Sequence, residues 1–239
     1  MVNSRALTFN NRGSAWDDKK NYDKAIADYE EAIRLDPKFQ SPRNGRRLAW
    51  SQQKAWDKII ADCDDAILQN KKNAELFNWR GYASLEKGDY DKAIADYEEA
   101  IRLDPKYQPP RSNRRLAWEK KGDWEKLIAD YEAALKEGSP TAATCNSLAW
   151  LRATCPVAKH RNGQQAVEYA TKACELTAWK EANNLDSLAA AYAEARDFDK
   201  AVEWQKKGMG LAPADQKADF ATRLKLYQDK KPYREPPSK

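Results

Sequence analysis

The 239-residue sequence predicts an all-α fold, a right-handed superhelical solenoid of antiparallel helix pairs. One observation is a repeat: YDKAIADYEEAIRLDPKFQ, residues 22–40, returns almost unchanged 68 residues later, at residues 90–108. Related segments begin at Trp56 and Trp124, so that neighbouring copies are 34 residues apart. The other observation is a low mean hydropathy of -0.94, which confines apolar residues to narrow helix faces. Units of this length bury their apolar faces by stacking on their neighbours.

The composition excludes several classes of protein. No run approaches the roughly 18 consecutive apolar residues that a membrane span needs, and residues 1–10 lack the apolar region of a secretory signal. We therefore expect a cytoplasmic protein without a membrane partner. The four cysteines are too few for a disulfide scaffold, and we expect them to be reduced and packed. The net charge of +5 comes from 42 basic and 37 acidic residues and identifies no partner by itself.

Each copy of the repeated segment is predicted to form an amphipathic helix. In residues 23–35 the apolar positions recur at spacings of three and four, at Ala25, Ile26, Tyr29, Ala32 and Ile33. Acidic residues lie on the opposite side and near the start of the helix, where the helix dipole favours them. We interpret these carboxylates as a solvated face and not as catalytic groups.

The predicted elements follow one another in regular order. A short extension, residues 1–5, precedes four repeats of equal length, and two less regular repeats and a capping helix come after them. The tail has the composition of a disordered segment. The predicted boundaries are 6–39, 40–73, 74–107 and 108–141 for the regular repeats, 142–181 for a fifth with a longer connection, 182–213 for a sixth, 214–229 for the capping helix and 230–239 for the tail.

Linked positions within the repeats carry a family resemblance. Counted from Ala6, the eighth, twentieth, twenty-fourth, twenty-seventh and thirty-second positions hold Gly13, Ala25, Tyr29, Ala32 and Pro37. The third repeat has the same residue types at the same places, Gly81, Ala93, Tyr97, Ala100 and Pro105. This pattern resembles the tetratricopeptide repeat, in which small residues let two helices approach closely and proline ends the second helix. The wording of residues 148–156 and 170–177 is also similar to that of planctomycete-type bacterial repeat proteins.

The resemblance implies a concave groove, lined by the first helix of each pair, that binds a peptide or protein segment. Groove-facing residues are then expected at the fifth and ninth positions of the repeats: Asn10, Ser14, Asn44, Leu48, Asn78, Tyr82, Ser112 and Leu116. Trp79, at a sixth position, would form an aromatic anchor together with Tyr82. The alternative is that the polar members of this set are merely solvated.

Arginines distinguish the second and fourth repeats from the others. They stand at the fourth, seventh and eighth positions, where the family pattern has an aromatic residue at the fourth and a small residue at the eighth: Arg43, Arg46 and Arg47, and Arg111, Arg114 and Arg115. A buried arginine is costly unless it is paired, or unless the helix pair opens. Three interpretations stay open: salt bridges to Asp62, Asp64 or Asp65, contact with an acidic partner, or nucleic-acid binding together with tryptophan. The 37 acidic residues count against nucleic acid.

No catalytic, metal or cofactor site is expected. His160 is the single histidine, and its spacing from Cys155 and Cys174 matches no common zinc pattern. Glycine-rich phosphate-binding motifs are missing from the sequence. The sequence therefore predicts a non-enzymatic interaction scaffold, with self-assembly into a homo-oligomer and nucleic-acid binding as alternatives. It leaves open whether the chain is natural or engineered.

Overall fold

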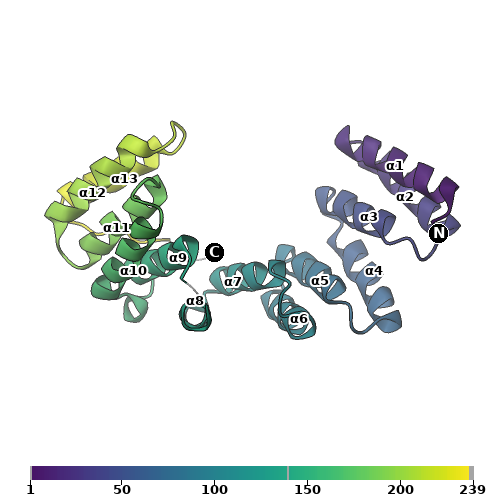
Figure 1. Cartoon of the computed structure of the whole chain (residues 1–239), viewed down its shortest axis with the longest axis horizontal. Coiled ribbons are helices and arrows are strands. Elements are labelled where there is room, and N and C mark those ends of the chain that lie inside the picture. Colours follow the sequence, from purple (N-terminus) through teal and green to yellow (C-terminus); the bar gives the residue numbers. More distant parts are fainter. Residues whose placement is uncertain (1, 139, 237–239) are drawn as a thin grey trace. The chain divides into compact units, whose positions relative to one another are not determined.

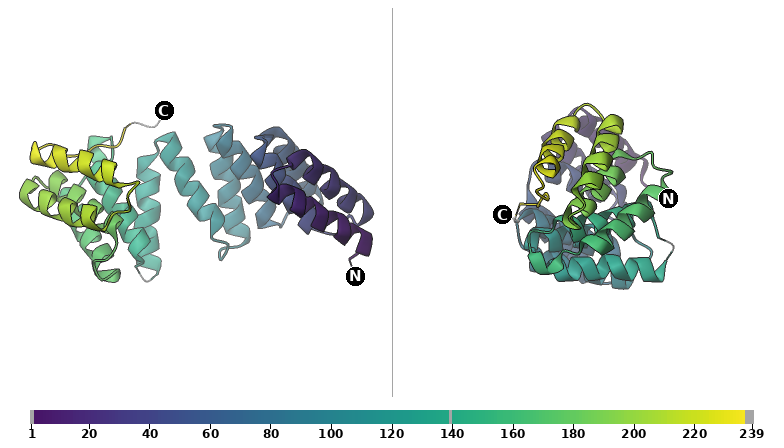
Figure 2. Two further views of the ribbon diagram at one scale, coloured as in Figure 1. Left: turned by 90° about the horizontal axis from the view of Figure 1, so that it is seen from above. Right: turned by 90° about the vertical axis from the view of Figure 1, so that its left-hand side faces the viewer.

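The structure is a computed structural model that describes residues 2–138 and 140–236. These residues form thirteen α-helices and one 3₁₀-helix and contain no strand, which confirms the predicted all-α fold (Figure 1). The chain divides into two compact units, unit 1 up to Ala117 and unit 2 from Trp118 onward. Within each unit, consecutive helices run antiparallel, and each predicted repeat contains two of them (Figure 2).

Unit 1 contains the first three regular repeats and the start of the fourth. Its helices are α1 (Ser4–Asp18), α2 (Tyr22–Leu35), α3 (Ser41–Gln52), α4 (Trp56–Gln69), α5 (Ala74–Glu86) and α6 (Tyr90–Leu103), followed by α7 (Pro109–Lys121), which continues into unit 2. Three of these helices start at a side chain that accepts a hydrogen bond from the first turn, Asn3 at α1, Asn21 at α2 and Asn73 at α5.

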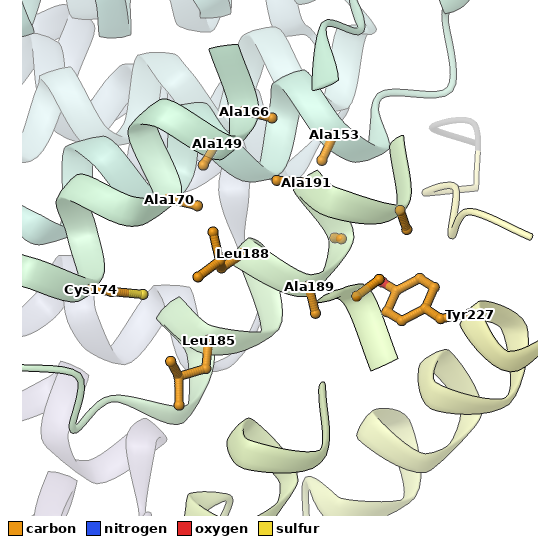
Figure 3. Packing of buried hydrophobic residues seen from close by; sticks show 13 residues of the cluster. Ala149, Ala153, Ala166, Ala170, Cys174, Leu185, Leu188, Ala189, Ala191 and Tyr227 are labelled. Carbon is orange, nitrogen blue, oxygen red and sulfur yellow. The ribbon is translucent and has the colours of Figure 1, made fainter. Parts of the chain in front are cut away.

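Unit 2 contains the second helix of the fourth repeat and the less regular repeats. Its helices are α8 (Trp124–Glu137), α9 (Ala142–Thr154), the 3₁₀-helix Ala158–His160, α10 (Gly163–Leu176), α11 (Ala182–Glu194), α12 (Phe198–Leu211) and α13 (Lys217–Gln228). Alanine dominates the core between α9, α10 and α11, and Figure 3 shows Leu188 of α11 directed toward Ala149 and Ala170. Short side chains here let three helices approach one another closely.

A tyrosine packed against glycines joins the first repeats of unit 1. Tyr29 of α2 is buried, and a Cβ atom added at Gly13 of α1 would lie 2.7 Å from its ring. A Cβ atom at Gly45 of α3 would lie only 2.5 Å from the same ring. Tyr97 has the same relation to Gly81 within the third repeat, at 2.7 Å. Glycine is required at these positions because the aromatic ring occupies the space of any side chain.

The second repeat replaces this arrangement by another. Cys63 stands where Tyr29 and Tyr97 stand in their repeats, and Arg47 stands where they have glycine. Arg47 fills the space between α3 and α4 and is only 1% exposed. These two helices also pack less closely than α1 on α2 or α5 on α6. The helix pair thus opens around a buried arginine.

The C-terminal tail differs from the predicted disorder. Residues 237–239 lie outside the described residues, but Tyr233, Arg234 and Glu235 contact α9 of unit 2. The polar and proline-rich composition predicts no structure by itself, whereas specific tertiary contacts hold this segment. Preceding it, α13 occupies the predicted capping segment and buries Phe220 and Tyr227.

Candidate functional site

Apolar side chains lie exposed at one repeat position on successive first helices of unit 1. Leu48 of α3 is 48% exposed, Leu116 of α7 is 39% exposed, and Tyr82 of α5 is half-buried. All three occupy the ninth position of their repeats, and we call them the apolar row. Ser14, at the same position of α1, is exposed and accepts a 3.4 Å hydrogen bond from the Tyr29 hydroxyl. The apolar row is a regular surface that the fold does not cover.

The asparagines at the fifth positions are engaged between repeats. The Ser41 hydroxyl donates to Asn10 Oδ1 at 3.3 Å, and Asn44 Nδ2 donates to Glu75 Oε1 at 2.8 Å. In the third repeat, Asn78 Nδ2 donates to the Tyr107 hydroxyl at 3.3 Å, and Asn113 Nδ2 of the fourth repeat donates to Asn78 Oδ1 at 3.1 Å. The fifth-position residue of the fourth repeat, Ser112, is exposed. The asparagines therefore link neighbouring repeats, and each amide nitrogen retains a second proton that can still be donated.

Trp79 and Tyr82 form part of an aromatic cluster. Their ring centroids are 6.2 Å apart in an edge-to-face arrangement, and Trp56 of α4 contacts Tyr82 in the same way at 5.7 Å. Trp79 also packs against the buried cluster that includes Trp50 and Cys63. Both predicted anchor residues are half-buried, so the cluster fixes their orientation while part of each ring stays accessible.

The arginines of the second repeat form ion pairs inside unit 1. Arg47 Nη2 lies 2.6 Å from Asp62 Oδ2, and its Nη1 donates to Asn44 Oδ1 at 3.2 Å. Arg46 pairs with the other oxygen of Asp62, and its guanidinium lies 4.5 Å from the centre of the Trp50 ring. The salt-bridge interpretation is therefore the one that the structure shows for Arg46 and Arg47. The cation over Trp50 is Arg46, one helical turn away from it, and not Arg47.

The remaining predicted arginines differ among themselves. Arg43 donates to the carbonyl oxygen of Pro37 at 3.1 Å, and Arg111 donates to that of Pro105 at 3.4 Å. Neither forms an ion pair with a carboxylate within residues 2–138 and 140–236. Arg114 and Arg115 also have interaction partners.

A cleft of about 390 Å³ adjoins Arg43, Arg46 and Arg47. The carboxylates of Asp62 and Asp65 line the same cleft, so it has no strong excess of positive charge. Arg46 and Arg47 share the carboxylate of Asp62, and Arg46 Nη1 also lies 3.9 Å from Glu30 Oε1, so Arg43 is the arginine of this cleft whose guanidinium pairs with no carboxylate of the described residues.

An ion pair that the sequence analysis missed recurs within the repeats. Arg12 Nη2 lies 2.6 Å from Asp28 Oδ1, and Arg80 Nη2 lies 2.6 Å from Asp96 Oδ1. Arg46 and Asp62 form the same pair in the second repeat. The arginine is always at the seventh position and the aspartate sixteen residues later. That recurrence was the available signal, and it identifies the seventh-position arginine as a structural residue and not as a feature of alternate repeats.

Among the described residues, no group of three or more His, Cys, Asp or Glu side chains is placed to hold a metal ion. Cys155 and Cys174 are buried, and burial raises the pKa of Cys174 to about 12. Burial also lowers the pKa of His160, and Lys159 beside it acts in the same direction. None of the helices in the described part of the chain combines the length and apolarity that crossing a bilayer requires.

Comparison with known proteins adds the fold family. The family pattern of the tetratricopeptide repeat matches residues 6–39 and 74–107, the first and third predicted repeats. A search of curated proteins finds no match.

Solved structures with the same fold extend the similarity to nearly the whole chain. PilW, a type IV pilus biogenesis factor, has 18% identity and a TM-score of 0.62, with 95% of this chain and 99% of that chain covered. PilF of Pseudomonas aeruginosa has 16% identity and a TM-score of 0.62, with 91% and 97% covered. A tetratricopeptide repeat protein from Parabacteroides merdae has 14% identity and a TM-score of 0.53, with 93% and 84% covered. Identities this low establish the fold alone.

Proposed function

We propose that this chain, two of whose repeats match the tetratricopeptide pattern, is a non-enzymatic scaffold that binds a protein or peptide segment along the first helices of unit 1. The apolar row carries the proposal. Leu48, Tyr82 and Leu116 stand at one position of three successive repeats and remain exposed to water. Because Leu48 and Leu116 are each less than half exposed, a partner that covers them gains about half of the roughly 1.5–3 kcal/mol that full burial of an exposed leucine contributes.

The polar residues around the apolar row provide hydrogen-bond donors on the binding surface. The remaining amide protons of Asn44 and Asn78 are available to the carbonyl groups of a bound segment. Such evenly spaced donors suit an extended or helical peptide whose apolar side chains face the row.

Arg43 and Arg111 favour an acidic flank on the ligand. Both stand at the fourth position, and in the described part of the chain each guanidinium donates only to a proline carbonyl oxygen. A carboxylate of the partner can form a charge-assisted hydrogen bond with either guanidinium. The proposed ligand is thus an apolar segment with Asp or Glu beside it.

The two alternatives predict different behaviour. A second copy of the chain would cover the same leucines and give a concentration-dependent dimer. Nucleic acid would need tryptophan rings free for stacking, but Trp50 is buried and one of its neighbours, Arg46, already lies over its ring. The structure therefore favours a protein partner over nucleic acid.

A peptide-library selection on the intact protein, at low and high salt, tests the proposal. We expect related apolar peptides with acidic flanks, and at least tenfold weaker binding after Leu48→Ser and Leu116→Ser together. Leu68→Ser is the matched control, because Leu68 is 74% exposed but lies on α4, a second helix. Arg43→Ala with Arg111→Ala should remove the preference for acidic residues and much of the salt dependence.

Three results would contradict the proposal. These are a selection that enriches no peptide, binding that survives the paired leucine changes, and equal losses in the Leu68→Ser control. Light scattering over a range of protein concentrations separates self-assembly from peptide binding, since only self-assembly changes the mass of the protein without ligand.

A further inference from the structure

The C-terminal segment of this chain lies on groove positions of unit 2. Counted from Ala142, Trp150 is at the ninth position of the fifth repeat, and Ala153 and Thr154 are at the twelfth and thirteenth. Glu194 is at the thirteenth position of the sixth repeat. In the tetratricopeptide pattern these positions face the groove. Every one of these residues contacts Tyr233, Arg234 or Glu235.

Glu235 is recognised through both its backbone and its side chain. Its backbone N–H donates to the carbonyl oxygen of Thr154 at 2.9 Å, and its Oε1 accepts a 3.0 Å hydrogen bond from Trp150 Nε1. Thr154 is the last residue of α9, whose terminal carbonyl groups have no partner within the helix. An extended segment thus satisfies a helix end, while its acidic side chain satisfies a tryptophan N–H.

Arg234 and Tyr233 are recognised by charge and by stacking. Arg234 pairs with Glu194, and its Nη1 donates to the carbonyl oxygen of Ala153 at 3.3 Å. A cation is favoured there because the C-terminal end of a helix carries partial negative charge. The Tyr233 ring lies 5.7 Å from the Trp150 ring, and the Arg223 guanidinium of α13 lies 5.6 Å from both ring centres. Three consecutive residues therefore meet three chemically different subsites.

From these contacts we infer that unit 2 has its own peptide-binding site, specific for an extended aromatic–basic–acidic sequence and occupied in cis by Tyr233–Glu235. A protein segment with the same order of side chains binds there by displacing the tail. The three tail residues are only half-buried, so their release exposes no large core. The site goes beyond the function proposed above, because it uses other residues and another ligand chemistry than the apolar row.

A labelled peptide with the sequence of residues 230–239, KKPYREPPSK, is the direct probe. We expect it to bind the full-length variant Tyr233→Ala/Arg234→Ala/Glu235→Ala, whose own tail cannot occupy the site. Binding to the wild-type chain should be at least tenfold weaker, because a tethered competitor acts at an effective concentration on the order of millimolar. A peptide of the same composition in scrambled order should bind neither protein.

Changes on the receiving surface complete the test. In the tail variant, an additional Glu194→Gln should weaken peptide binding at least tenfold. The matched control Glu203→Gln removes an exposed carboxylate of α12 and should leave binding unchanged. Leu48→Ser with Leu116→Ser should also leave it unchanged, which separates failure of this site from failure of the unit 1 surface.

Several outcomes would overturn the inference. They are no binding to a tail variant whose helical circular dichroism is intact, equal binding to the wild-type chain, and equal binding of the scrambled peptide. If the tail variant does not fold, the Trp150 indole N–H resonance in a Glu235→Ala variant decides the matter. We expect that resonance to shift when the Glu235 carboxylate that accepts its hydrogen bond is lost, and an unchanged resonance contradicts the proposal.

Discussion

Arg47 and Cys63 occupy positions at which the first and third repeats have glycine and tyrosine. In those repeats a large ring fills the space beside a residue that has no side chain. In the second repeat the large side chain is the arginine and the small one is the cysteine, and Asp62 neutralises the buried charge. The two residues therefore have complementary sizes within the second repeat, whereas the fourth repeat combines Arg115 with Tyr131 at these positions.

A double-mutant cycle tests this complementarity. Cys63→Tyr alone should destabilise the protein by about 1–3 kcal/mol, because the added ring overlaps Arg47. Arg47→Gly alone should cost about 3–5 kcal/mol, since it removes one partner of a buried ion pair. Together they should cost about 1–3 kcal/mol less than the sum, as measured by urea unfolding of all four proteins. Additive effects would contradict the interpretation, and Arg43→Gly with Cys63→Tyr is the additive control.

At this scale the sequence predicted a part of the site. It indicated that Arg47 needs a partner or an open helix pair, and the structure shows both. It did not identify the Arg12 and Arg80 pairs, because a lone arginine beside acidic residues is typical of a solvated face. The exposure of Leu48 at a predicted groove position follows from the helix phase, whereas the bonds that engage Asn44 depend on side-chain conformations that no periodicity contains.

Close approach between helices depends on single glycines at fixed positions. Gly13 of α1 is in contact with the buried ring of Tyr29, whereas nothing lies within 4 Å of a Cβ atom added at Gly210 of α12. Both residues are inside helices, where alanine has the higher intrinsic propensity. The two sites differ in packing, which makes them a matched pair for testing how repeats associate.

Gly13→Ala should destabilise the protein by about 1–3 kcal/mol, because the Tyr29 ring is buried and cannot move aside cheaply. Gly210→Ala should stabilise it by about 0.5–1 kcal/mol through helix propensity alone. Urea unfolding monitored by circular dichroism measures both changes. A stabilising effect of Gly13→Ala would show that Tyr29 does not fix the distance between α1 and α2.

The turns show why element boundaries were predictable but their conformations were not. Lys20, Lys54, Gly88 and Gly122 stand at the fifteenth position of their repeats, and each has a positive φ between 55° and 84°. Glycine signals this left-handed conformation, whereas lysine does not. The only sequence signal for this conformation at Lys20 and Lys54 was that they align with Gly88 and Gly122 of the other repeats. For residues 233–235, composition predicted disorder because the partners of Arg234 and Glu235 on α9 and α11 are at least 40 residues away in sequence.

All four thiols of the chain, in both units, are buried. Burial raises the pKa of Cys63 and of Cys174 to about 12, and it also raises the pKa of Cys145 and of Cys155. A free thiol has a pKa of about 8.5. The folded molecule therefore holds its thiols in the protonated and unreactive form throughout the neutral range.

At pH 8 we expect a disulfide reagent to label none of the four cysteines in the folded protein and all of them in denaturant. A variant with Ser112→Cys provides an exposed thiol as the positive control. The raised pKa values also set the sign of the alkaline response. Their contribution to stability is complete below about pH 8.5 and is lost as the pH rises toward 12, because only the unfolded thiols ionise. Rapid labelling of the folded protein would contradict the burial of these groups.

For the molecule as a whole, repetition predicted the all-α fold and the order of the helix pairs, since the 34-residue spacing is visible without any tertiary information. The division into two compact units was not predictable in this way. It depends on which helices pack closely, and the irregular second half of the chain obeys the repeat pattern only in part.

The first repeat places the large side chain at Tyr29, and the second repeat has the small Cys63 at the same position. This difference restricts how an array of such repeats can lengthen during evolution. Each of these residues packs against a residue of its own repeat and is followed by a particular residue at the sixth position of the next repeat. That residue is Gly45 for Tyr29 and Trp79 for Cys63. Duplicating the third repeat alone would place Trp79 after Tyr97, and duplicating the second alone would place Gly45 after Cys63. The near-identity of residues 22–40 and 90–108 agrees with a duplication of 68 residues, and the sixth position after Tyr97 now holds Asn113 in place of glycine.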